Sequence, residues 1–237
     1  MFYFKQFSIK QEQSAMKVST DSVLLGASVP IVDCSKVLDI GAGTGILSLM
    51  IAQRMSTPEI DAVEIDQDTY QECLYNIQKS IWANRINCYH TDIENFTENC
   101  FSKYDIIISN PPFYTEDYIS TNQKRKIARS TQSLSFEKLL DSVAKLIASD
   151  GYFAVIIPYK EEKSFVELAS KNTLYPKQIT HIKGRAEIDF KRSLLIFSTE
   201  KKKIQYKELC IEISRHKYTP EYINLTKDFY LNIEKNS

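Results

Sequence analysis

From residue 36 onward the chain alternates short β-branched runs with longer segments of helical periodicity, and this alternation restricts the folds open to it. The β-branched runs are KVLDIG, EIDAVEID, INCYHTD and YDIIISN, and the helical segments between them include GILSLMIAQR and DTYQECLYNIQKSIWA. Strands that alternate with helices form parallel sheets with right-handed crossovers. Several runs are apolar throughout, as strands covered on both faces are. The sequence therefore predicts an α/β fold with a doubly wound, mostly parallel sheet.

The second half of the chain continues this pattern. SFEKLLDSVAKLIASD places apolar residues at helical spacing, and GYFAVIIP follows it as an apolar strand. Further elements are expected on both sides of this region: helices at Asp21–Ser28, near Glu162–Asn172 and after Thr219-Pro220, and strands near Gln178–Lys183, Leu194–Ser198 and Cys210–Ser214.

The length of the chain suits one domain. Its 237 residues, 43% of them hydrophobic, can bury one substantial core, and no internal repeat or low-complexity linker divides them. We predict a single domain over residues 1–237, with a core at 36–200 and extensions at 1–35 and 201–237. The N-terminus lacks the apolar segment of a secretory signal, and no apolar run approaches the ~20 residues that span a bilayer. We therefore expect a soluble, cytoplasmic protein without a membrane segment.

Metal-binding patterns are not found in the sequence. The five cysteines and three histidines are scattered, with no C-x-x-C pair and no histidine at ligand spacing. We therefore assign no metal.

Charged side chains are unevenly distributed along the chain. Residues 59–118 hold 12 acidic and 3 basic side chains, whereas residues 122–217 hold 11 acidic and 20 basic ones. Such faces are often only solvated, but clustered cations also suit a polyanion such as nucleic acid. We expect a substrate of this kind to contact the first basic cluster, which comprises Lys124, Arg125, Lys126 and Arg129.

VLDIGAGTG, residues 37–45, is a strand that runs into a glycine-rich turn and then a helix. Gly41, Gly43 and Gly45 let the backbone approach a ligand that any Cβ would exclude, as in nucleotide-type pockets. The dinucleotide fingerprint is the rival interpretation, but Asp39 at the strand end would oppose a phosphate. S-adenosylmethionine carries an ammonium and a sulfonium and no phosphate. The motif therefore favours this cofactor over NAD.

Two further carboxylates lie at the ends of the next two strands. Glu64 stands where a carboxylate can accept both hydroxyls of an adenosine ribose, a feature that NAD sites share. Asp92 could accept the exocyclic amine of the adenine of the cofactor. We expect both residues to bind the cofactor.

SNPPF, residues 109–113, ends the fourth strand at the crevice where such sheets bind ligands. A Pro-Pro turn that merely stops a strand would use the same residues. The neighbouring VLDIGAGTG favours catalysis, because the side-chain oxygen of Asn110 and the carbonyl of Pro111 can accept the two N–H groups of an exocyclic amine. This localises the lone pair of the amine for attack on a methyl group. Pro111 and Pro112 hold the acceptors rigid, and Phe113 offers a ring on which a base can stack.

VLDIGAGTG, AVEID, TDIENF and SNPPF, in this order, resemble the class I S-adenosylmethionine-dependent methyltransferases that act on amino or amide nitrogens. KQFSIKQEQSAMKVSTDSVLLGA, SIWANRINCYHTDIENF, RKIARSTQSLSFEKLL and YTPEYINLTKDFYL resemble the bacterial tRNA1(Val) adenine-37 N6-methyltransferase family, so that the resemblance covers nearly the whole chain. It implies a Rossmann-like fold with a seven-stranded sheet, helices on both faces and small terminal additions.

The resemblance also implies roles for individual residues. It assigns cofactor binding to Asp39, Gly41, Gly43, Gly45, Glu64 and Asp92, catalysis to Asn110, Pro111, Pro112 and Phe113, and a place beside the cofactor pocket to Lys17, Thr20 and Asp21. Phe113 departs from the family pattern, because adenine N6 enzymes more often carry Tyr there, whereas guanine N2 methyltransferases of rRNA often carry Phe.

We therefore expect a monomeric enzyme that moves a methyl group from S-adenosylmethionine to N6 of the adenosine just 3′ of the anticodon in a valine tRNA. Alternative substrates are guanine N2 of rRNA and a release-factor glutamine, whose amide would fit the same two acceptors. The non-enzyme alternative is a catalytically silent RNA-binding protein of the same fold. The intact SNPPF and VLDIGAGTG motifs argue against it.

Overall fold

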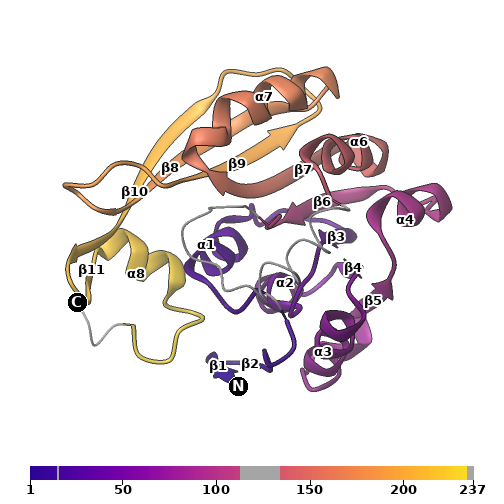
Figure 1. Cartoon of the computed structure of the whole chain (residues 1–237), viewed down its shortest axis with the longest axis horizontal. Helices are drawn as coiled ribbons and strands as arrows, with labels where there is room; N and C mark the ends of the chain where they lie inside the picture. Colours follow the sequence, from indigo (N-terminus) through magenta and orange to yellow (C-terminus); the bar gives the residue numbers. More distant parts are fainter. Residues whose placement is uncertain (15, 113–133, 234–237) are drawn as a thin grey trace, which may run out of the picture.

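A nine-stranded mixed sheet forms the centre of the computed structural model, which describes residues 1–14, 16–112 and 134–233 (Figure 1). Within these residues the strands lie in the order β11-β10-β8-β9-β7-β6-β3-β4-β5. In chain order they are β3 (Lys36–Ile40), β4 (Glu59–Glu64), β5 (Ile86–His90), β6 (Tyr104–Ser109), β7 (Ile147–Pro158), β8 (Tyr175–Arg185), β9 (Arg192–Ser198), β10 (Gln205–Ser214) and β11 (Lys217–Tyr218).

The predicted α/β fold is confirmed. Strands β5, β4, β3, β6 and β7 are parallel, and β9 lies antiparallel between β7 and β8. Within the described residues the sheet has nine strands rather than the seven predicted. The two additional strands are β10, which pairs in parallel with β8, and β11, which pairs antiparallel with β10. Both added strands come from the predicted C-terminal extension. β10 includes the strand expected at Cys210–Ser214, but it is not the edge strand, because β11 lies outside it among the described residues.

Helices cover both faces of the sheet (Figure 1). One face carries α1 (Thr20–Ser28), α2 (Ile46–Arg54), α3 (Gln67–Gln78) and α8 (Pro220–Thr226), and the other carries α4 (Ile93–Asn99), α6 (Phe136–Leu146) and α7 (Glu162–Lys171). Successive strand residues point to opposite faces. Ile106 and Ile108 of β6 therefore join one hydrophobic core, and Ile107 joins the other. This two-sided burial explains why the run YDIIISN is apolar without alternation.

Two helices end earlier than the sequence predicts. α3 ends at Gln78, where the Ser80 hydroxyl donates to the Ile77 carbonyl (2.8 Å), and a short 3₁₀ turn, Ala83–Arg85, follows it. α6 ends at Leu146, because Ile147 already pairs with Tyr104 of β6 and so begins β7. In both places local hydrogen bonding or sheet pairing outweighs helical periodicity.

The two terminal additions contact each other as well as the core. β1 (Phe2–Tyr3) and β2 (Ser8–Ile9) form an antiparallel pair, and the amide between them at Lys5 donates to the Phe229 carbonyl (2.8 Å). The rings of Phe4 and Tyr230 lie 5.9 Å apart. The domain boundaries at residues 35 and 200 stay a prediction.

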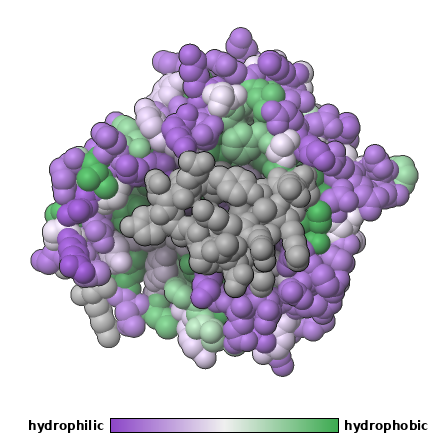
Figure 2. Space-filling model, viewed as in Figure 1, coloured by the Kyte–Doolittle hydropathy of each residue, from purple (hydrophilic) through white to green (hydrophobic). Residues whose placement is uncertain are grey.

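Most of the coloured surface in Figure 2 is hydrophilic, with hydrophobic side chains in small patches. Along the described parts of the chain, no helix is long and apolar enough to cross a membrane. In the same residues, no three His, Cys, Asp or Glu side chains come together as ligands for a metal ion. The polar side chains predicted to bind the cofactor or to take part in catalysis lie at the carboxyl ends of β3, β4, β5 and β6.

Candidate active site

A cavity opens at the carboxyl ends of the central parallel strands, beside β3, where the chain order of the strands reverses. Doubly wound sheets bind ligands at this position. The cavity brings together six of the residues predicted from the sequence, namely Gly41, Gly43, Glu64, Asp92, Asn110 and Pro112. Its other walls are Met16, Ile40, Val63, Ile65, Asp66, Thr69, Thr91, Ile93 and Leu134.

Two glycines leave space on the cavity side of the loop after β3. Gly41 and Gly43 have φ angles of +70° and +59°, in the left-handed region that favours glycine. A Cβ atom at Gly41 would have Leu134 as its nearest neighbour at 3.9 Å, and one at Gly43 would have only the Gly41 carbonyl at 4.0 Å. A side chain at either position would therefore project into open space beside or within the cavity.

Gly45 serves a different purpose, because it is not part of the cavity wall. It is the residue before α2 and has a φ of +80°. A Cβ atom there would lie 3.0 Å from the Cys73 sulfur of α3. The structure thus explains Gly45 by the close packing of the loop on α3, and its contact with the cofactor stays a prediction.

Gly45→Ala should destabilise the protein by about 1–3 kcal/mol, since a left-handed residue would gain a side chain and press on Cys73. Gly43→Ala adds the same backbone strain but faces open space, so it serves as the matched control. We expect Gly45→Ala to give the larger fall in melting temperature and Gly43→Ala the larger loss of cofactor affinity. Equal melting temperatures for both variants would contradict the packing role of Gly45.

Glu64 is buried at the end of β4, and backbone amides hold both of its oxygens. Oε2 accepts from the Gly43 amide and Oε1 from the Asp66 amide, each at 2.9 Å. Burial raises the pKa of Glu64, while the hydrogen bonds from Asp66 and Gly43 offset part of the increase. Because a carboxylate can accept about four hydrogen bonds, Glu64 retains acceptor capacity at the cavity.

Asp39 is fully buried in β3 and is only half satisfied. Its Oδ2 accepts from the Ser48 amide (3.1 Å) and hydroxyl (2.7 Å), whereas Oδ1 has no hydrogen-bond partner among the described residues. Burial raises the pKa of Asp39 to about 7. The Ser48 hydrogen bonds limit this rise, and the charge of Glu64 adds to it. Asp39 lies behind the cavity wall, where its charge suits a ligand that brings a cation or a donor.

Asp92 lies at the junction of β5 and α4. It is the N-cap residue of α4, and its Oδ1 accepts from the Asn95 amide at 2.8 Å. Its second oxygen adds an acceptor to a wall that is otherwise apolar at Ile93 and Ile65.

Asn110 follows β6 directly, and its side chain is nearly buried (9% exposed). The Ser109 hydroxyl donates to the Ile40 carbonyl (2.9 Å), which fixes the end of β6 against β3. The Nδ2 of Asn110 donates to the Ser22 hydroxyl of α1 (3.1 Å), and its Oδ1 has no hydrogen-bond partner among the described residues. The site therefore presents a preorganised, unpaired acceptor at the cavity wall.

The described cavity wall contains only some of the residues expected at the site. Phe113 and the basic cluster of Lys124, Arg125, Lys126 and Arg129 fall outside the described residues. Pro111 is buried and is not part of the cavity wall, whereas Pro112 is. Of the N-terminal addition, Met16 lines the cavity instead of Lys17, Thr20 or Asp21. Asp21 accepts from Arg192 of β9 at 2.7 Å.

The sequence-based assignment missed some cavity residues. Asp66 and Thr69 form the N-cap of α3, in which the Asp66 carboxylate accepts from the Thr69 amide (3.0 Å). Their D-x-x-T spacing was a detectable capping signal. Met16, which lines the cavity, carried no signal in the sequence. Ser22, the partner of Asn110, carried none either, because only the folded chain brings α1 beside the end of β6.

Comparisons with known proteins agree with this geometry. Residues 13–154 match the model of the methyltransferase small domain family. A protein of Flavobacterium johnsoniae named tRNA1(Val) (adenine(37)-N6)-methyltransferase is 49% identical, over 98% of this chain and 99% of its own. A protein of the same name from Flavobacterium psychrophilum is 48% identical, with the same coverage of both chains.

A solved structure supports the fold alone. A predicted O-methyltransferase from Agrobacterium tumefaciens superposes with a TM-score of 0.71 at 18% identity, over 88% of this chain and 96% of its own. The sequence matches cover nearly the whole chain, and they agree with the fold and with the cavity where the strand order reverses. The chain belongs to the tRNA1(Val) (adenine(37)-N6)-methyltransferase family, within the class I S-adenosylmethionine-dependent methyltransferases.

Proposed function

We propose that this protein transfers a methyl group from S-adenosylmethionine to N6 of adenosine 37 in a valine tRNA. The observation that carries the proposal is the buried Oδ1 of Asn110 at the cavity wall, which has no hydrogen-bond partner among the residues that the structure describes. The printed names of the relatives from the two Flavobacterium species supply the substrate. An acceptor in this position suits an exocyclic amine, which brings N–H donors.

The groups around the cavity fit the cofactor. Gly41 and Gly43 leave room for a ligand against the backbone, and Glu64 has acceptor capacity for the ribose hydroxyls. Asp92 has a second oxygen for the adenine amine. Asp39 supplies a buried negative charge, which suits a cofactor that is cationic and has no phosphate. When bound, the cofactor would supply a methyl group bonded to a positively charged sulfur.

Asn110 and Pro111 would activate the target amine. The lone pair of an exocyclic amine is delocalised into the base, which makes the nitrogen a poor nucleophile. Hydrogen bonds from its two N–H groups to Asn110 Oδ1 and to the Pro111 carbonyl would localise this lone pair toward the methyl carbon. The nitrogen would take the methyl group that the cofactor supplies and would lose one of its own protons. The Ser22 hydroxyl, bound to Nδ2, keeps Oδ1 available for this purpose.

The proposed enzyme acts as a single chain in the cytoplasm on tRNA. The basic cluster at Lys124 to Arg129 stays the proposed contact with the RNA.

Mass spectrometry of nucleosides tests the proposal. The purified protein is incubated with S-adenosylmethionine and an unmodified valine tRNA transcript, which is then digested and mapped. We expect N6-methyladenosine at position 37 and no product in a transcript with guanosine at that position. N2-methylguanosine in rRNA, methylglutamine in a release factor, or no product with any substrate would each contradict the proposal.

A further inference from the structure

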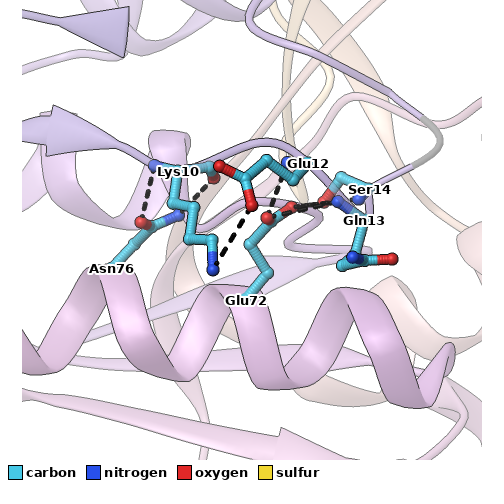
Figure 3. Close-up of polar contacts among 6 residues, drawn as sticks. All are labelled: Lys10, Glu12, Gln13, Ser14, Glu72 and Asn76. Atoms are coloured by element: carbon cyan, nitrogen blue, oxygen red, sulfur yellow. Dashed lines mark hydrogen bonds and ion pairs between the residues drawn. The ribbon is translucent and has the colours of Figure 1, made fainter. Parts of the chain in front are cut away.

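Residues 10–14, which we name the strap, are held against α3 by two side chains (Figure 3). Glu72 accepts from three consecutive strap amides: Glu12 to Oε1 (2.7 Å), Ser14 to Oε2 (2.9 Å), and Gln13 to both oxygens (3.2 and 3.3 Å). Asn76, one helical turn further on, accepts from the Lys10 amide at 2.8 Å. Glu72 and Asn76 therefore bind main-chain amides of the strap. The side chains of the strap do not reveal this contact in the sequence.

Glu72 is built to stay ionised. It is only 4% exposed, and burial alone would raise its pKa. Hydrogen bonds from the amides of Glu12, Ser14 and Gln13 outweigh burial and lower the pKa of Glu72 below its ordinary value. A buried carboxylate that several amides satisfy fixes the strap more firmly than neutral hydrogen bonds would.

Asn76 connects the strap to the glycine-rich loop. Its Nδ2 donates to the carbonyls of Lys10 and Thr44, each at 2.9 Å, and Thr44 lies between Gly43 and Gly45. Asn76 is itself 2% exposed. One face of α3 thus holds both the strap and the glycine-rich loop, whose residues Gly41 and Gly43 line the cavity.

The strap leads directly to the cavity wall. Gln11 of the strap accepts from the Val18 amide at 2.7 Å, which closes this segment just before the N-cap of α1 at Ser19. Met16, within the closed segment, lines the cavity and is 36% exposed. Neither Glu72 nor Asn76 lines the cavity.

We propose that Glu72 and Asn76 are positioning residues for the cofactor: by holding the strap and the glycine-rich loop on α3, they keep Met16 closed over S-adenosylmethionine. The identity of this ligand rests on the proposed function. A strap released from α3 samples many conformations, and only a fraction of them place Met16 against the ligand. The apparent dissociation constant rises as the reciprocal of that fraction.

Glu72→Ala tests the proposal, with Asp105→Ala as its matched control. Asp105 also binds main-chain amides, because its Oδ2 accepts from the amides of Ser35 (2.7 Å) and Lys36 (3.0 Å). These bonds lie at the amino ends of β3 and β6, away from the cavity. Both variants lose a carboxylate that fixes backbone, and both should lower the melting temperature. Only Glu72→Ala should raise the calorimetric dissociation constant of S-adenosylmethionine, by about tenfold or more if the competent fraction falls to about a tenth.

Conservative replacement and hydrogen exchange complete the experiment. Glu72→Gln keeps one acceptor oxygen, so it should recover most of the affinity for S-adenosylmethionine. It should also fold even if Glu72→Ala does not. In Glu72→Ala, the amides of Glu12 and Ser14 should exchange faster, and saturating S-adenosylmethionine should slow them again. A parent that does not bind S-adenosylmethionine contradicts the proposed function itself. If the parent binds S-adenosylmethionine, three results contradict only the role of the strap: Glu72→Ala binds as well as the parent, Glu72→Gln binds no better than Glu72→Ala, or Asp105→Ala is equally impaired.

Discussion

Asn110→Ala is expected to reduce the single-turnover rate of methyl transfer by about 10²–10³. The variant loses the buried acceptor Oδ1 while the adjacent prolines preserve the course of the backbone. The target amine then keeps its delocalised lone pair even when the base is correctly seated. Because this interaction strengthens only as the amine reacts, the rate should fall far more than the affinity for tRNA or cofactor.

Single-turnover rates at saturating S-adenosylmethionine, together with tRNA affinities, measure this effect. Ser22→Ala is the control, since it removes the partner of Nδ2 but leaves Oδ1 in place. It should lower the rate by about tenfold, as expected for the loss of one ordinary positioning hydrogen bond. If Asn110→Ala methylates at the parental rate, the amine is activated by another group.

Asp39→Asn should have opposite effects on stability and on binding. In the parent, burial raises the pKa of Asp39 from 3.8 to about 7, so the folded protein binds this proton more tightly than the unfolded chain does. The contribution of Asp39 to the free energy of unfolding therefore falls as the pH rises from about 4 to about 7, and above pH 7 the whole cost of a buried carboxylate remains. The neutral asparagine avoids this cost. We expect the ligand-free variant to be more stable than the parent at pH 8 by about 1–3 kcal/mol, and equally stable near pH 4.

The same substitution should weaken S-adenosylmethionine binding at least about tenfold, because it removes a buried negative charge behind the site. In the parent, a cationic ligand should lower the pKa of Asp39, so that binding near pH 7 releases a proton. Calorimetry in two buffers of different ionisation enthalpy measures this release, which should disappear in Asp39→Asn. If the difference in stability between the parent and Asp39→Asn is the same at pH 4 and pH 8, Asp39 does not titrate as the structure indicates.

The features visible in the sequence are those that depend on residues close together in the chain. Strand and helix alternation, the glycine turn and the acid at the end of each strand all follow from local patterns. Because parallel strands share one carboxyl edge, these patterns also placed Gly43, Glu64 and Asp92 around one cavity. Asp92, two residues after β5, shows that one residue can begin a helix as its N-cap and also line the cavity.

The features that escaped the sequence depend on contacts between distant segments. Ser22 meets Asn110 and Glu72 meets the strap only after α1 and α3 have packed on the sheet. Gly45 shared the pattern of a ligand-binding glycine, although the structure explains it by contact with Cys73. The sequence also did not predict that β10 pairs with β8. An alternating pattern indicates which face of a strand is buried, but it does not indicate which strand is its neighbour.

The contact between the two ends of the chain has a consequence for biosynthesis. Residues 4 and 5 are synthesised before residues 229 and 230. The Lys5 amide nevertheless donates its hydrogen bond to the Phe229 carbonyl, and the ring of Phe4 packs near that of Tyr230. A nascent chain can form the central strands early, whereas residues 4 and 5 must wait for residues 229 and 230. The segment that leads from β2 to Met16 can therefore be held on α3 by Asn76 and Glu72 before Lys5 gains its partner at Phe229.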